Sequence, residues 1–106
     1  MERSVPVAGG MWLLVAFTAA AATDVVNQVP GPLGEFGAAA IRSAAGGVSL
    51  GRVAISVAKD LKPEGFRIRA ANGGYEIAGG DARGAMYGAL DFAEQVELSG
   101  KVRDKD

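Results

Sequence analysis

The feature that most constrains the fold of this chain is a pair of alternating segments joined by Asn72-Gly73. Residues 65–70 (GFRIRA) and 74–79 (GYEIAG) alternate along their length, which is typical of half-buried strands. Asn-Gly is a preferred two-residue turn of β-hairpins. With this turn, three pairs lie opposite each other: Ile68 with Ile77, Ala70 with Tyr75, and Arg69 with Glu76. A slip of one residue would spoil all three pairs, so the sequence predicts an antiparallel hairpin in this register.

A helix is predicted on each side of this hairpin in the sequence. The first begins at Leu33, ends at Gly46 and Gly47, and has an apolar stripe at helical spacing, made of Leu33, Phe36, Gly37, Ala40, Ile41 and Ala44. The second begins after Asp81, a good N-cap acceptor, and ends at Ser99 and Gly100. Its predicted buried stripe consists of Ala82, Ala85, Met86, Ala89, Leu90, Ala93 and Val96.

Residues 52–58 (RVAISVA) alternate large branched and small side chains and predict one more strand, with both faces covered. The economical packing is an α/β (α+β) fold in which a small, mainly antiparallel sheet carries two helices on one face. Residues 33–100 then form one domain, preceded by a linker at 23–32 that contains the sequence VPGP. The charged residues 101–106 are expected to form a solvated, loose tail.

Residues 1–22 are predicted to be a signal peptide. Met11 to Ala22 is an apolar run of 12 residues that follows Arg3 and ends in small residues, as secretory signals do. It is shorter than the roughly 20 residues that span a bilayer, so no stable membrane span is expected. The alternative is that residues 12–17 supply a first buried strand. The signal-peptide interpretation predicts a secreted or periplasmic protein.

The composition excludes several kinds of chemistry. The chain has no cysteine and no histidine, which removes thiolate and imidazole metal sites and Ser-His-Asp triads. Its formal net charge of −1 offers no basic surface for nucleic acid. Four carboxylates could be imagined as a glycosidase acid and base, but each has a simpler role in pairing, capping or solvation; they are Glu76, Asp81, Asp91 and Glu94. We therefore predict no catalytic, cofactor-binding or metal-binding residue.

Two glycines of the second helix suggest a surface for another domain. Gly84 and Gly88 are four residues apart and lie outside the predicted apolar stripe, although glycine costs roughly 1 kcal/mol in a helix interior. Together with Arg83, Tyr87 and Asp91 they form a predicted docking interface. Close packing inside the domain and a ligand site remain the alternatives.

The segment from Leu61 to Val96 resembles the N-terminal accessory domain of bacterial family 20 hexosaminidases and family 67 type α-glucuronidases. The matching residues are Glu64, Gly65, Phe66, Ile68, Tyr75, Ile77, Asp81, Gly84, Tyr87, Gly88 and Leu90. The resemblance implies a sheet with two helices on one face that supports a catalytic barrel, and it implies a docking role for Gly84, Tyr87 and Gly88.

A chain of 106 residues cannot hold this domain and a barrel of roughly 250 residues as well. The first hypothesis is therefore a non-catalytic accessory domain whose partner is the barrel of a parent glycoside hydrolase, inactive when alone. The alternative is a free-standing secreted module that binds a protein or a glycan.

Overall fold

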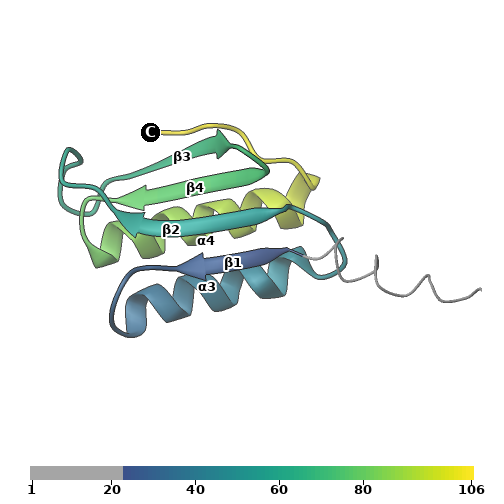
Figure 1. Cartoon of the computed structure of the whole chain (residues 1–106), viewed down its shortest axis with the longest axis horizontal. Helices are drawn as coiled ribbons and strands as arrows, with labels where there is room; N and C mark the ends of the chain where they lie inside the picture. Colours follow the sequence, from purple (N-terminus) through teal and green to yellow (C-terminus); the bar gives the residue numbers. More distant parts are fainter. Residues whose placement is uncertain (1–22) are drawn as a thin grey trace, which may run out of the picture.

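A computed structural model describes residues 23–106 (Figure 1). The predicted signal peptide and its alternative, a first strand at 12–17, lie outside the described residues. The elements in chain order are β1 (Asp24–Asn27), α3 (Pro32–Ala45), β2 (Arg52–Val57), β3 (Phe66–Ala71), β4 (Gly74–Gly79) and α4 (Ala82–Ser99). The two helices lie on one face of a four-stranded sheet, so the predicted α+β class is confirmed.

The sheet has mixed strand directions, whereas we expected a mainly antiparallel one. The order is β1-β2-β4-β3, in which β1 pairs parallel to β2 and β2 pairs parallel to β4. Only β3 and β4 are antiparallel. The helix α3 connects β1 to β2 and returns the chain to the end where it started, which gives parallel strands. The hairpin then places β4, and not β3, beside β2, so the second strand of the hairpin is also parallel to β2.

Strand β1 lies within residues 23–32, where we expected only a linker. Its four residues are too few for an alternating pattern to stand out in the sequence. The Thr23 hydroxyl donates to the Val48 carbonyl over 2.9 Å and accepts from the Leu50 amide over 3.0 Å, which ties the start of β1 to the loop before β2. Residues 28–31 then lead to Pro32, which begins α3 one residue before the predicted start at Leu33.

The hairpin register is confirmed in full. Ile68 is the partner of Ile77, Ala70 of Tyr75, and Arg69 of Glu76. The Asp81 side chain caps α4 by accepting from the Gly84 amide over 2.8 Å, also as predicted.

The core lies between the sheet and the helices. Its largest fully buried side chains are Phe92, Ile41, Ile55, Ile68, Ile77, Val29 and Val53. The Tyr75 and Phe92 rings meet edge to face at a centroid distance of 5.2 Å, which joins β4 to α4. No helix within residues 23–106 is both long and apolar enough to cross a membrane.

Both helices are rotated relative to the predicted stripes. The buried residues of α3 are Gly34, Gly37, Ala38, Ile41 and Ala45, while Phe36 is 58% exposed. The buried residues of α4 are Gly84, Ala85, Gly88, Ala89, Phe92, Ala93 and Val96. Glycines let the backbones approach closely here: a Cβ atom at Gly37 would lie 2.8 Å from the Ala89 Cβ. The predicted stripes included Gly37 but left out Gly34, Gly84 and Gly88, which are buried on these faces.

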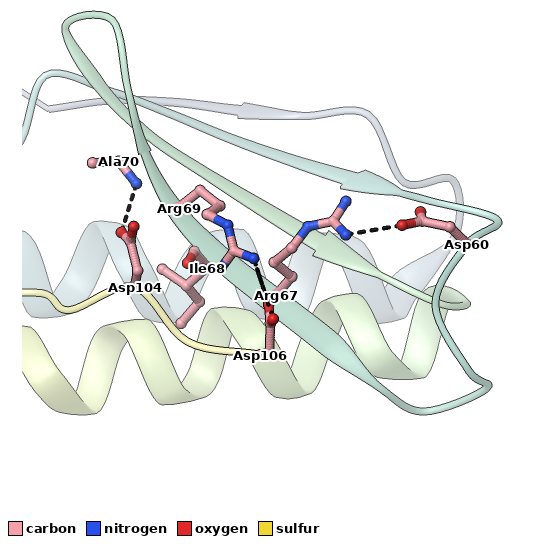
Figure 2. Close-up of polar contacts among 7 residues, drawn as sticks. All are labelled: Asp60, Arg67, Ile68, Arg69, Ala70, Asp104 and Asp106. Carbon is pink, nitrogen blue, oxygen red and sulfur yellow. Dashed lines mark hydrogen bonds and ion pairs between the residues drawn. The ribbon is translucent and has the colours of Figure 1, made fainter.

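The tail at residues 101–106 is attached to the sheet, contrary to the expectation that it is loose. Lys105 forms an antiparallel bridge with Ile68 on the outer edge of β3. Figure 1 shows the yellow C-terminal segment beside β3, and Figure 2 shows its contacts. Its charges suggested solvation, but the edge of β3 offers backbone partners that the charge pattern alone does not reveal.

Candidate docking surface

Two of the five predicted docking residues are buried inside the domain. Gly84 faces the loop before β3, where a Cβ atom would collide with the Gly65 carbonyl oxygen, and Gly88 faces the sheet. At Gly88 it would lie 2.8 Å from the Ile77 Cγ2 and 3.0 Å from the Phe66 Cβ. Packing within the domain accounts for both glycines. The predicted buried stripe of α4 contained the buried residues Ala85, Ala89 and Ala93 but left out Gly84 and Gly88, which lie on the same face.

The other three predicted residues lie on or beside the outward side of α4. Tyr87 is 39% exposed, a large fraction for an aromatic side chain, and Arg83 is exposed one turn before it. Arg83 lies 3.8 Å from the Glu64 carboxylate, a long and exposed ion pair. Asp91 is half-buried; its carboxylate accepts from the Gln95 amide over 2.9 Å and pairs with the Lys105 ammonium over 2.7 Å. The side chains remaining for contact with a partner are therefore those of Arg83, Tyr87 and Asp91.

A shallow hollow, here called the helix groove, runs between α3 and α4 on the side away from the sheet. It is lined by Ala40, Ser43, Tyr87, Leu90, Asp91, Ala93, Glu94 and Glu97. Alanines, Leu90 and the Tyr87 ring provide its apolar part, and carboxylates stand along the α4 side. Phe36 lies one turn before Ala40 on α3 and adds an exposed ring to the same helix layer. Such an apolar strip rimmed by polar groups is typical of a contact surface.

The sequence prediction named Tyr87 and Asp91 of this groove and missed its other side. Ala40 and Ser43 come from α3, which packs along α4. The order of the strands decides which face of α3 lies beside α4. Because the predicted sheet lacked β1, the prediction could not place α3 at this groove. The spacing of Tyr87, Leu90 and Glu94 on one side of α4 is the signal that could have extended the prediction along that helix.

The opposite face of the sheet carries no helix among the described residues. Its hollow is lined by Gln28, Arg52, Ala54, Ser56, Ala71, Asn72, Tyr75 and Glu76. Small side chains from β2 leave this face flat, with Arg52 and Glu76 at its surface. It offers a control surface on the far side of the domain from the helix groove.

Several charged groups of the described residues act in capping and pairing. Asp81 holds two amides, those of Gly84 and Glu64, the latter over 3.2 Å. Asp60 accepts from the Arg67 guanidinium over 2.9 Å, and this hydrogen bond lowers the pKa of the Asp60 carboxyl from its usual value. Residues 23–106 contain no cluster of three potential metal ligands. The surface with the features of a binding site is therefore the helix groove.

Comparison with known proteins identifies the fold and no family. No family model matches the chain, and no curated protein matches it. A solved structure described as a GH138 enzyme targeting pectin rhamnogalacturonan II matches 78% of this chain with a TM-score of 0.63 and 16% sequence identity. The chain covers 15% of that enzyme. The fold of this domain is thus shared with part of a glycoside hydrolase.

Proposed function

We propose that this chain is a non-catalytic N-terminal accessory domain of a glycoside hydrolase, of the hexosaminidase or α-glucuronidase type. The observation that carries the proposal is the shared fold, which takes up a small part of a much longer glycoside hydrolase. The pattern from Glu64 to Leu90 that resembles those accessory domains supports it independently, because it rests on the sequence alone.

The residues of that pattern have structural roles, which suits a supporting domain. Gly84 and Gly88 let α4 lie directly on β3 and β4, and Asp81 starts the helix. The first turn of α4 thus rests on the loop that carries Glu64 and Gly65. These contacts maintain the shape of the domain, and none of these residues needs to meet a substrate.

The helix groove is the surface that we assign to the catalytic barrel. It lies on the side of the helices away from the sheet, and it exposes Tyr87, Leu90 and the small residue Ala40 to a partner. A buried aromatic anchor in a strip of small residues is a common centre of protein interfaces. Arg83 and the carboxylates of Asp91 and Glu94 would then form the polar rim of the interface.

The proposal is tested by the reading frame that continues beyond the Asp106 codon, together with a turnover assay. We expect the frame to encode a catalytic glycosidase domain, and we expect the purified chain alone to hydrolyse no aryl glycoside. A frame without such a domain would favour the free-standing binding module. Turnover by the chain alone that persists after contaminating proteins are removed would contradict the non-catalytic assignment.

A further inference from the structure

The outer edge of β3 binds residues 104–106 of the same chain through backbone and side-chain groups. The Ile68 amide donates to the Lys105 carbonyl over 2.7 Å, and the Lys105 amide donates to the Ile68 carbonyl over 2.8 Å. The Ala70 amide donates to the Asp104 carboxylate over 2.9 Å (Figure 2). Both outward-facing amides of this part of β3 therefore have partners from the tail.

Charge adds to this pairing on both sides of Lys105. The Arg69 guanidinium lies 2.9 Å from the Asp106 carboxylate, and the Lys105 ammonium lies 2.7 Å from the Asp91 carboxylate of α4. Figure 2 shows Asp104 and Asp106 reaching β3 at two successive positions, at Ala70 and at Arg69. Two acidic side chains separated by one residue thus match one amide and one guanidinium of the edge strand.

Among the described residues, the tail contacts this edge through few groups. β3 is the last strand of the sheet, and a single residue pair, Ile68 with Lys105, bridges it to the tail. The Asp106 side chain is 69% exposed and the Arg69 side chain 42% exposed, and ion pairs so exposed hold weakly. A strand edge covered by one exchangeable bridge remains open to other strands.

We propose that the β3 edge is a strand-addition site for an extended peptide with acidic side chains at alternate positions, and that residues 104–106 occupy it as an intramolecular competitor. The peptide adds antiparallel to β3, exchanges both backbone hydrogen bonds with Ile68, and places acidic side chains two residues apart on the Ala70 amide and the Arg69 guanidinium. A second β3 strand fits poorly, because Arg67 and Arg69 would meet arginines across the new pair. This site lies on the sheet edge and shares Asp91, the partner of Lys105, with the helix groove. It does not depend on the proposed function.

The test uses the full chain with Lys105→Pro, which removes the amide that donates to Ile68 and disfavours pairing at this position. Lys105→Ala is the matched control, because it removes the same ammonium group and keeps the amide. We expect the Ile68 amide to exchange slowly with solvent in the unsubstituted chain and in Lys105→Ala, and to exchange much faster in Lys105→Pro. Equal exchange in all three proteins would contradict the role of the tail.

The probe is a capped five-residue peptide with the sequence of residues 102–106, added to the Lys105→Pro protein. We expect saturable shifts of the Ile68 and Ala70 amide resonances and slowed exchange at Ile68. A peptide with asparagine in place of both aspartates, and the double variant Lys105→Pro with Arg69→Gln, are expected to give much smaller shifts. No shift with the peptide that keeps both aspartates, or equal shifts with both peptides, would overturn the proposal.

Discussion

Replacing Gly88 by leucine tests whether α4 packs on the sheet through its glycines. The first side-chain carbon alone would lie 2.8 Å from the Ile77 Cγ2 and 3.0 Å from the Phe66 Cβ. Carbon atoms in favourable contact are about 3.5–4.0 Å apart. The Phe66 Cβ is fixed by its own backbone, so rotation of the ring cannot relieve the contact. The three further carbons of leucine have no space unless α4 moves away from β3 and β4.

The expected cost follows from two opposing effects. Overpacking a core typically destabilises by about 1–3 kcal/mol, and Gly88→Leu lies at the upper end because the clash involves two strands. Replacing a glycine in a helix interior raises the stability of the helix by roughly 1 kcal/mol, which opposes this loss. We therefore expect a net loss of about 2 kcal/mol in the free energy of unfolding. In a domain of 60–100 residues this lowers the Tm by about 8–16 °C.

The assay is urea unfolding followed by circular dichroism, with Glu94→Leu as the matched control. Glu94 is an exposed residue of the same helix, so leucine there meets no packed atoms. We expect the control to change the unfolding free energy by about 0.5 kcal/mol or less. If Gly88→Leu unfolded at the same urea concentration as the control, the close packing of α4 on the sheet would be refuted.

Three further predictions concern the cap, an ion pair and the leader. Asp81→Ala should lower the free energy of unfolding by about 1–2 kcal/mol, because the Gly84 amide loses its acceptor. Asp81→Asn keeps an acceptor oxygen and should lower it by less. Urea unfolding of the two variants measures this difference. Arg67→Gln should raise the pKa of the Asp60 carboxyl toward its usual value, seen in an NMR titration, and a titration identical to that of the unsubstituted chain would contradict the assignment. Because that pKa is lowered in the folded chain, the pairing stabilises above the ordinary carboxyl pKa and is lost as the pH falls through the lowered value. If residues 1–22 are a signal peptide, the exported protein should begin at Thr23 in N-terminal sequencing, and an intact Met1 would contradict it.

The parts of the fold that sequence predicted correctly depend on local chemistry. Asn72-Gly73 sets the turn and hence the register of Ile68 with Ile77, and Asp81 caps the helix that follows directly. Each of these features is decided within a few neighbouring residues. The alternation of residues 52–58 identified β2 for the same reason.

The missed features depend on partners distant in the sequence. Strand β1 is stabilised by its pairing with β2, more than 20 residues later, and its own four residues carry little pattern. Neither the parallel pair β1–β2 nor the parallel pair β2–β4 was predicted, so the sheet was expected to be mainly antiparallel. The tail was likewise predicted from its charges, whereas its position depends on the β3 edge and on Asp91.

The candidate surface was predicted in part because glycine carries two opposite meanings. Gly84 and Gly88 were taken as places where another domain approaches, and the approaching element is the sheet of this domain. A glycine in a helix suggests that another segment packs closely against it, but the sequence does not show which segment. Tyr87 and Asp91 line the helix groove, and their docking role stays a prediction.

The measurement that tests the docking claim most directly is the rate of thiol alkylation at position 87. The chain has no cysteine, so Tyr87→Cys introduces a single reporter in the helix groove, and Ser56→Cys introduces one on the opposite sheet face. We expect both to react quickly in this chain alone. In a protein that also contains the catalytic domain, we expect alkylation at position 87 to slow strongly while position 56 reacts at an unchanged rate. Equal rates at position 87 with and without the catalytic domain would contradict docking through the helix groove.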